Sequence, residues 1–440
     1  MLHRVDIIGA GISGLTTAYY LAKQNAGLEI HVWEKDVTPG GLAGTFALPD
    51  GGHIEKFYHH FYRNDTAVQS LIAELNLERF LIWRPAATGT YHFGQPYRLS
   101  SPMDLLQFKP LSLLDRLRFG WLIVHARTVR DWRKLDDLSA RNYITRIAGE
   151  MVYHVIWKPL FHGKFGKYAD SISAAWLWSK LVDRGGSRNR QGHELLGYLQ
   201  GGLSRLFETL VTRLQEAGHR VHLGKAVLRL EGTVDRISTL VTDEGTFQAG
   251  MVIGCAQVPD VINLLPDSVN DYRNALRRIE FLANVCLVLT LKRSLSRFYW
   301  TNVTDPTAPF IGIIEQTQWA DRHEYNHKHI VYISAYVLPG DPRLSMSAEE
   351  LVDSYFPSIK QLFPEFTRDI VEAQTVWKAP YAQPVVQVGY RHVLPEIVSP
   401  ISNFFLCTMA QIYPHDRQIS NGVAMAQRMA EVVRQQKGGL

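Results

Sequence analysis

The feature that most constrains this chain is a glycine-rich turn near its N-terminus, between a short apolar strand and a helix. Residues 5–8 have strand character, the next six read Gly9-Ala10-Gly11-Ile12-Ser13-Gly14, and apolar residues then recur at helical spacing. The first glycine permits the tight turn, the second lets a pyrophosphate approach the backbone, and the third lets the helix pack on the strand. The start of such a helix attracts phosphate through free N–H groups and a partial positive charge. The sequence therefore predicts a dinucleotide-binding βαβ unit.

A carboxylate follows this motif at the distance that a dinucleotide requires. The second predicted strand, residues 29–33, ends at Glu34, twenty residues after Gly14. A carboxylate in this position accepts hydrogen bonds from an adenosine ribose and repels a ribose 2′-phosphate. We therefore expect Glu34 to hold the ribose of the bound nucleotide.

A second glycine-rich stretch identifies the type of dinucleotide. After Lys35 the chain reads Thr38-Pro39-Gly40-Gly41-Leu42-Ala43-Gly44-Thr45. An acid followed by GG-x-x-G-T resembles the superfamily of flavin-containing amine oxidases, protoporphyrinogen oxidases and phytoene desaturases. The resemblance implies FAD, whose diphosphate and flavin ring lie along this loop in that superfamily. The FAD contacts that it implies here are Gly9, Gly11, Ile12, Ser13, Gly14, Glu34, Lys35, Gly40, Gly41, Leu42, Ala43, Gly44 and Thr45.

Later segments resemble the remaining FAD-binding pieces of the same superfamily. Gly201-Gly202 opens a helical stretch, and two strands follow, of which the second begins near Val227, the valine whose backbone contacts adenine in that superfamily. Residues 246–255 resemble the strand that re-enters the dinucleotide sheet. A strand over 403–408, a loop over 413–417 and a helix over 421–433 follow near the C-terminus. The usual Gly-Glu or Gly-Asp after that strand is Thr408-Met409 here, so Asp416 and Arg417, with Val423 in the helix, are the expected flavin contacts.

The expected fold class is α/β, with a Rossmann-like FAD-binding domain built from discontinuous segments and a mixed α+β substrate domain. A chain of 440 residues, 46% hydrophobic and 20% charged, is too long for one ordinary core. Residues 1–60, 197–271 and 391–440 are assigned to the FAD-binding domain. Residues 61–196 form the mainly helical part of the substrate domain, and residues 272–390 form its sheet part. Strands over 281–291 and 329–336 are expected to pair in an antiparallel sheet over the flavin.

A stretch dense in histidine, tyrosine and arginine connects the flavin loop to the substrate domain. It runs from Gly51 to Asp65 and contains His59 and His60. The stretch resembles a His-rich segment that lies next to the flavin in UDP-galactopyranose mutases. We therefore expect His59 and His60 to be catalytic groups that contact flavin or substrate and transfer protons near neutral pH. The alternative is that each histidine is a hydrogen-bonded structural residue.

Further candidates for substrate binding are cations and tyrosines. Lys158 lies in an aromatic and cationic segment, residues 157–166, and Arg184, Arg188 and Arg190 follow it. Such groups suit an anionic small-molecule substrate, although a solvated surface has the same composition. Tyr332 and Tyr336 lie on one face of a predicted strand and are candidates together with Tyr58, with ordinary core packing as the alternative for the tyrosines.

The expected function is FAD-dependent oxidation or desaturation of an organic substrate by hydride transfer to flavin N5. One dinucleotide fingerprint is present, so electrons are expected to pass from substrate to FAD and then to oxygen, a quinone or another acceptor. Two alternatives remain at this point. One is a nucleotide-sugar mutase similar to UDP-galactopyranose mutase, and the other is a flavoprotein that keeps FAD without catalysis.

Residues 104–134 have the composition of a segment that contacts membranes. They hold seven Lys or Arg against three Asp, and Leu113, Leu117 and Trp121 recur at helical spacing. A basic amphipathic helix with tryptophan can lie on an anionic membrane, as in the protoporphyrinogen oxidase group that this position resembles, although an ordinary packed helix has the same pattern. The three widely spaced cysteines suit a reducing compartment, so a cytoplasmic location is expected, either free or peripheral to the membrane. Neither a metal site nor a nucleic-acid partner is expected.

Overall fold

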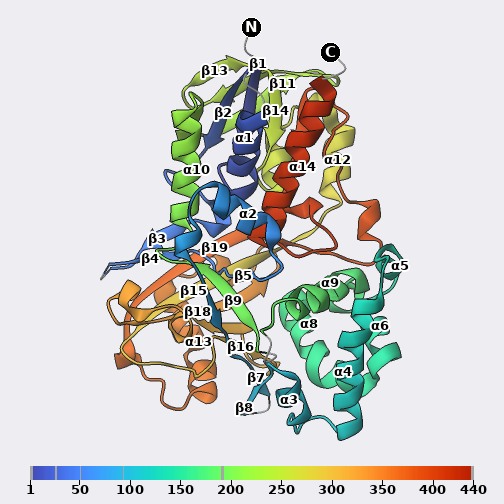
Figure 1. Cartoon of the computed structure of the whole chain (residues 1–440), viewed down its shortest axis with the longest axis vertical. Helices are drawn as coiled ribbons and strands as arrows, with labels where there is room; N and C mark the ends of the chain where they lie inside the picture. Colours follow the sequence, from blue (N-terminus) through green and yellow to red (C-terminus); the bar gives the residue numbers. More distant parts are fainter. Residues whose placement is uncertain (1–2, 25–26, 50, 93, 190–192, 438–440) are drawn as a thin grey trace.

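The computed structural model describes residues 3–24, 27–49, 51–92, 94–189 and 193–437. Figure 1 shows two parts along the long axis of the molecule. A sheet with its helices lies beside the two termini, and a second large sheet lies at the other end, flanked by a lobe of helices. The chain passes between these parts several times, as expected for a cofactor domain built from separate segments.

The sheet beside the termini is parallel and has the strand order β10-β2-β1-β14-β20. Every neighbouring pair of these strands is parallel. The strands come from residues 1–60, 197–271 and 391–440, so the predicted Rossmann-like sheet of discontinuous segments is confirmed. Their bounds are β1 (His3–Ile8), β2 (Leu28–Glu34), β10 (Arg220–Leu223), β14 (Met251–Gly254) and β20 (Phe404–Leu406).

The segment 246–255, expected as one strand, forms two. Residues Gly245–Gln248 are β13, which pairs with β12 (Ile237–Thr242) and, through it, belongs with β11 (Val227–Gly232) in an antiparallel meander. Met251 then begins β14 beside β1. Gly250 lies between the two strands, against the backbone of Arg4: a Cβ at Gly250 would lie 2.0 Å from the Arg4 carbonyl oxygen, so this position requires glycine.

Four helices share one apolar core with a face of the parallel sheet: α1 (Ile12–Gln24), α2 (Thr66–Glu74), α10 (Ser204–Glu216) and α14 (Ile419–Lys437). Helix α2 belongs to this core although its residues lie in the segment assigned to the substrate domain. The meander packs with α11 (Val258–Leu264) and α12 (Asn270–Arg277) in another cluster that includes Ile8, Trp33 and Val252 of the sheet.

The second large sheet has seven strands in the order β19-β15-β18-β17-β16-β7-β8. The expected antiparallel pairing of residues 281–291 with 329–336 is present, as β15 with β18. Helix α13 (Ala348–Leu362) packs in a core with β15 and β18. The strand bounds are β7 (Thr88–His92), β8 (Gln95–Arg98), β15 (Phe281–Leu291), β16 (Trp300–Val303), β17 (Gly312–Glu315), β18 (His329–Val337) and β19 (Val371–Pro384).

The helical lobe comes from residues 102–185, and in it the expected helix of residues 104–134 is divided among three. These are α3 (Pro102–Leu106), α4 (Leu113–Thr128) and α5 (Arg133–Asp136). The other helices of the lobe are α6 (Ala140–Ala148), α7 (Glu150–Val152), the π-helix η3 (Tyr153–Trp157), α8 (Lys158–Phe165) and α9 (Ala174–Gly185). Within the described ranges, no helix is both long enough and apolar enough to cross a bilayer.

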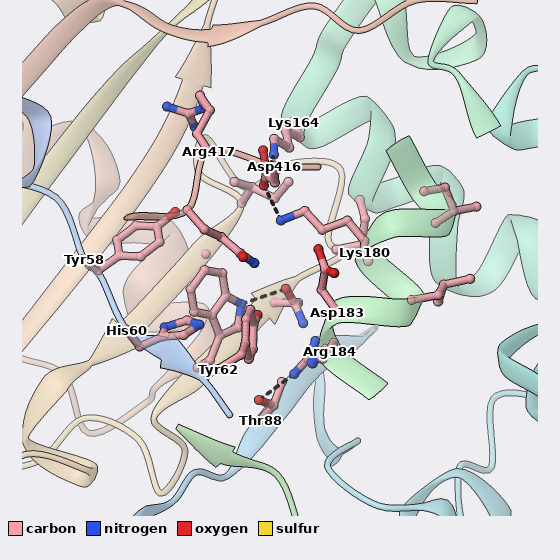
Figure 2. Close-up of a pocket in the computed structure, with 18 of the residues that line it drawn as sticks. Tyr58, His60, Tyr62, Thr88, Lys164, Lys180, Asp183, Arg184, Asp416 and Arg417 are labelled. Carbon is pink, nitrogen blue, oxygen red and sulfur yellow. Dashed lines mark hydrogen bonds and ion pairs between the residues drawn. The ribbon is translucent and has the colours of Figure 1, made fainter. Parts of the chain in front are cut away.

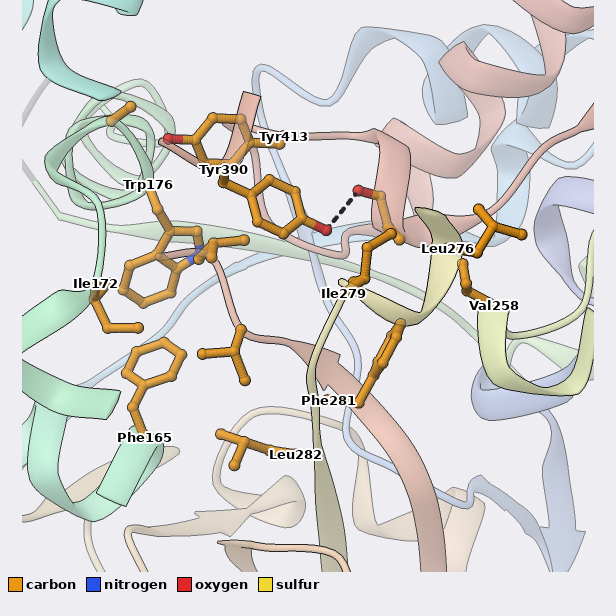
Figure 3. Packing of buried hydrophobic residues seen from close by; sticks show 14 of the residues in the cluster. Phe165, Ile172, Trp176, Val258, Leu276, Ile279, Phe281, Leu282, Tyr390 and Tyr413 are labelled. Atoms are coloured by element: carbon orange, nitrogen blue, oxygen red, sulfur yellow. Dashed lines mark hydrogen bonds between the residues drawn. The ribbon is translucent and has the colours of Figure 1, made fainter. Parts of the chain in front are cut away.

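An apolar cluster joins the lobe to the rest of the molecule. Figure 3 shows Phe165 and Trp176 of the lobe in the same packed region as Tyr390 and Phe281. The Tyr390 hydroxyl donates to the carbonyl of Ala410 at 3.1 Å, close to the strand that ends the parallel sheet. Lobe and cofactor sheet are therefore held in a fixed arrangement by a shared core. Two small sheets complete the fold: β3 (Thr45–Ala47) with β4 (His53–Glu55), and β5 (Phe61–Tyr62) with β9 (Leu195–Leu199) and β6 (Leu81–Pro85).

Candidate functional site

The first glycine-rich turn has the geometry that the sequence predicts. Gly9 has a φ of 108°, and its N–H donates to the carbonyl of Trp33 at 2.8 Å. A Cβ at Gly14 would lie 1.9 Å from the Gly9 carbonyl oxygen, so only glycine lets α1 approach the turn. At Gly11, by contrast, no described heavy atom other than those of Gly11 and its two chain neighbours lies within 4 Å of the Cβ position. The turn is thus closed on the side of the sheet and open beside Gly11.

The second glycine-rich stretch closes against the first. Gly40 has a φ of 115°, and its N–H donates to the carbonyl of Ala10 at 2.9 Å. The 3₁₀ helix η1 (Gly41–Ala43) follows and places Gly41 next to Gly11, whose Cα would lie 3.5 Å from a Cβ at Gly41. The chain then continues through Gly44 into β3. Both predicted loops therefore meet at the N-terminus of α1.

Glu34 lies between the two loops at the end of β2. Its carboxylate accepts hydrogen bonds from the N–H of Ala10 at 2.7 Å and from the N–H of Asp36 at 3.0 Å. Burial raises its pKa, and these two hydrogen bonds oppose that change. Two donors leave lone pairs for a ribose hydroxyl. Lys35, the next residue, is exposed.

The structure places two of the later candidate segments beside the parallel sheet. The link before Val227 runs along the end of β2, where the N–H of Lys225 donates to the carbonyl of Glu34 at 2.7 Å. Val423 is buried in α14, within the core that α14 shares with α1. Helix α14 approaches α1 closely at Gly422, where a Cβ would lie 2.9 Å from a methyl carbon of Ile12.

A cavity of about 470 Å³ lies between these loops, the large sheet and the helical lobe. Leu42 of the second glycine loop, residues 57–60 and residues 416–419 before α14 form its cofactor side. Helices α4, α8 and α9 and strands β15–β19 contribute the other walls. Figure 2 shows Arg417 and Asp416 toward one end and Arg184 and Thr88 toward the other.

His59 and His60 both line the cavity, and both are neutral at pH 7. The Nδ1 of His59 lies 2.6 Å from the Phe57 carbonyl, and the Nδ1 of His60 lies 3.1 Å from the Tyr299 hydroxyl. Burial lowers the pKa of His59 to about 4 and that of His60 to about 3. The expected proton transfer near neutral pH does not agree with these values. The two imidazoles can still orient a bound molecule through hydrogen bonds.

A partly buried group of charges lies on the cavity wall beside the rings of Trp176 and Tyr336, next to α14. Asp416 pairs with Lys180 and lies 3.9 Å from the Nζ of Lys164. The Lys164 ammonium also lies 4.7 Å from the centre of the Trp176 ring and 5.1 Å from that of Tyr336. Burial lowers the pKa of Lys164 to about 7. Although burial raises the pKa of Asp416, the neighbouring cations hold it well below its usual value.

Of the remaining candidates for substrate binding, some line the cavity and others do not. Tyr58 and Tyr336 line the cavity, and Arg417 donates to the Tyr336 hydroxyl at 3.2 Å. Tyr332 does not line it, because its hydroxyl donates to the Glu55 carbonyl at 2.8 Å within the protein. Lys158 is also absent from the described cavity lining, whereas Lys164, on the same helix, is part of it. Arg190 lies outside the described residues.

Several lining residues were not predicted from the sequence. They are separated along the chain and carry no motif: Thr88, Lys164, Lys180, Asp183, Asn284 and Tyr299. The cationic and aromatic composition of residues 157–166 was a signal for Lys164. No sequence pattern that we recognise marks the others.

Comparison with known proteins connects this geometry to a family. A family model for flavin-containing amine oxidoreductases matches residues 12–430. The chain belongs to this family. It is therefore an FAD-dependent oxidoreductase, which confirms the FAD and the enzyme class predicted from the glycine motifs.

The relatives of this oxidoreductase include carotene desaturases. It is 23% identical to 15-cis-phytoene desaturase of an Oncidium hybrid cultivar over 392 residues, covering 82% of this chain and 64% of the relative, which is less than two thirds of that protein. It is 22% identical to zeta-carotene desaturase of Arabidopsis thaliana, covering 92% of this chain and 80% of the relative. The structure of reduced UDP-galactopyranose mutase has the same fold, with a TM-score of 0.76 at 12% identity over 98% of this chain and 95% of the mutase.

The residues at the two glycine loops fit the diphosphate of FAD. The first hydrogen bond of α1 runs from the N–H of Leu15 to the carbonyl of Gly11, so the N–H groups of residues 12–14 have no acceptor within the helix itself. They border the open space beside Gly11. Gly9, Gly11 and the other residues of both loops would hold the diphosphate, and Glu34 would hold the ribose. Arg417 and the start of α14 would lie beside the flavin.

Proposed function

We propose that this oxidoreductase oxidises or desaturates an organic substrate held in the 470 Å³ cavity. One observation carries the proposal: the cavity wall includes Leu42, residues 57–60 and residues 416–419, which belong to the segments expected to contact the flavin. A molecule in this cavity is therefore adjacent to the cofactor side of the protein. FAD, when bound, supplies a hydride acceptor at flavin N5.

The protein contributes binding, orientation and the handling of a proton. Removing two hydrogens from neighbouring atoms releases a proton as well as a hydride, and the proton needs an acceptor. Lys164, with a pKa of about 7, can hold or release a proton at Nζ near neutral pH, and Asp416 lies beside it. His59 and His60 remain neutral and orient the substrate.

The names of the curated relatives support desaturation as the form of the reaction. Two of them are a phytoene desaturase and a zeta-carotene desaturase. Desaturation of a carbon chain needs a long apolar cavity, and apolar side chains of α4, α8 and α9 line much of this one. An open cavity also argues against a flavoprotein that keeps FAD without catalysis.

Anaerobic reduction of the flavin tests the proposal. The purified yellow protein is mixed without oxygen with a panel of unsaturated and saturated hydrocarbons, amines and nucleotide sugars, and flavin absorbance is recorded. An oxidised or desaturated substrate bleaches the flavin and gains a double bond. If no compound bleaches the flavin, and a nucleotide sugar is isomerised only after the flavin has been chemically reduced, the mutase alternative replaces the proposal.

We also propose that the outer face of α4 contacts an anionic membrane. Leu113, Leu117 and Trp121 have 62%, 56% and 55% of their surface exposed, and Arg118 beside them is half exposed. Apolar side chains bordered by arginine suit the boundary between anionic head groups and acyl chains. Phe119 and Ile123 of the same helix line the cavity, which supports entry of an apolar substrate from this side.

A further inference from the structure

The cavity walls carry an excess of positive charge. Among the described lining residues, six are Lys or Arg and three are Asp or Glu. At the cofactor side, Lys164, Lys180 and Arg417 lie near the carboxylate of Asp416. At the other end, around Arg184, the cations are all guanidinium groups, and Glu194 pairs with Arg184.

Three arginines meet at this end of the cavity. Arg184 donates to both carboxylate oxygens of Glu194, at 2.6 and 3.0 Å, and to the Thr88 hydroxyl at 2.8 Å. Its side chain is nevertheless 41% exposed, and it lines the cavity, so a molecule in the cavity can reach it. Arg188 and Arg127 line the same end.

The surroundings hold these side chains in place. Arg127 Nη2 donates to the carbonyl of Gly185, the residue after Arg184, at 3.0 Å. Arg188 Nη1 donates to the carbonyl of Ser100 at 2.7 Å. Burial lowers the pKa of Arg188, and the charges of Arg184 and Arg127 add to this effect against the opposing effect of Glu194. Partly buried like charges cost free energy, which a bound anion would offset.

The neighbouring wall is apolar. Helices α4 and α9, the end of η3 and helix α8 present Phe119, Ile123, Trp157, Leu160, Phe161 and Leu177 to the cavity. Figure 2 shows Arg184 and Arg417 at opposite ends, with Lys180 and Asp183 between them. A molecule that reaches from the arginines to the cofactor side therefore passes along apolar side chains.

We propose that the substrate is an amphiphile whose anionic head group, a phosphate or a carboxylate, is bound by Arg127, Arg184 and Arg188. Guanidinium groups bind both anions through paired N–H donors. The hydrocarbon part lies along the apolar wall and reaches the cofactor side, so the head group determines which carbon atoms face the flavin. This inference rests on the proposed function and specifies its substrate class.

Equilibrium binding to the FAD-loaded protein tests the inference. The probes are decyl phosphate, decanoate and decanol, which share one chain and differ in the head group, used below their micelle concentrations and followed by quenching of tryptophan fluorescence. In wild type at least one of the two anions should bind roughly 10- to 100-fold more tightly than decanol. Arg127→Gln combined with Arg188→Gln should remove most of that preference and leave the decanol affinity unchanged.

The matched control is Arg213→Gln, on α10 outside the cavity, where Arg213 pairs with Glu216 at 3.2 Å. Arg184 is left in place because its pair with Glu194 supports the fold. FAD content and melting temperature verify that each variant is folded. Equal affinities of wild type for all three probes, or an unchanged anion preference in the double variant, would overturn the inference.

The test does not depend on turnover. If decyl phosphate or decanoate binds as expected but neither an amphiphile nor any compound of the earlier panel bleaches the flavin, the head-group site stands and the proposed reaction fails. If only neutral hydrocarbons bleach the flavin and the anions do not bind, the reaction stands and the head-group site fails.

Discussion

Replacing Glu55 with glutamine tests how the separate cofactor segments are held together. Glu55 ends β4 and is buried, with 1% of its surface exposed. Its carboxylate accepts hydrogen bonds from the N–H of Leu203 at 2.8 Å and from the hydroxyl of Tyr198 at 3.0 Å. These hydrogen bonds join the first segment of the FAD-binding domain, residues 1–60, to the turn at the start of the second, residues 197–271. Burial raises the pKa of Glu55 from its ordinary 4.5 to about 7.

The raised pKa gives the sign and size of a pH effect. Between pH 4.5 and 7 the folded protein keeps a proton on Glu55 that the unfolded chain has lost, so this contribution to stability is present below pH 4.5 and is lost as the pH rises through 7. One pKa unit corresponds to about 1.4 kcal/mol. From pH 5 to pH 8, ionisation of Glu55 should lower the free energy of unfolding by about 2.5 kcal/mol. A glutamine side chain resembles the protonated carboxyl group and cannot ionise, so the variant should not lose stability in this way.

Urea unfolding of wild type and Glu55→Gln, both loaded with FAD, measures the effect at pH 5, 6, 7 and 8. The free energy of unfolding of the variant, relative to that of wild type, should increase by about 2.5 kcal/mol from pH 5 to pH 8. Asp65, whose pKa burial also raises to about 7, contributes equally to both proteins and cancels. Glu216→Gln, at an exposed position of α10, should follow wild type. A stability difference between wild type and Glu55→Gln that stays constant from pH 5 to 8 would refute the argument.

Three further predictions concern the cofactor, the cavity and the surface. Glu34→Gln should raise the dissociation constant of FAD roughly tenfold or more in a flavin fluorescence titration, because a buried anionic acceptor is lost; an unchanged constant contradicts its role. His60→Ala should keep the FAD content of wild type but slow flavin reduction by substrate, and loss of flavin would show a structural role instead. Leu117→Ser with Trp121→Ser should reduce co-sedimentation with anionic liposomes, whereas Leu228→Ser, at a position also 55% exposed, should not. Equal sedimentation of all proteins would remove the membrane contact.

The cofactor loops could be predicted from the sequence because their physical requirements are local. Gly9 must adopt a positive φ, and Gly14 must let the helix approach the turn, and both needs appear as glycine at fixed spacing. The spacing between Gly14 and Glu34 in the sequence is set by the length of one helix and one strand. The parallel order of β1, β2 and β14 then follows from the usual construction of such units.

The cavity could be predicted only in part, because its walls come from segments that are distant in the sequence. The residues 157–166 indicated a cationic site, but which lysine faces the cavity depends on how α8 packs, and Lys164 rather than Lys158 does so. Tyr332 and Tyr336 share one face of β18, as expected. Only Tyr336 reaches the cavity, since Tyr332 is covered by Tyr58 and Glu55. Composition also gave no measure of burial, which determines that His59 and His60 stay neutral.

Helix α4 lies between the cavity and the protein surface, and its diameter is about 10 Å. Trp121 lies on its outer side, and Phe119 and Ile123 lie on its inner side. The exposed side chains and the cavity-lining side chains of α4 belong to one helix, so any displacement of α4 moves both sets together.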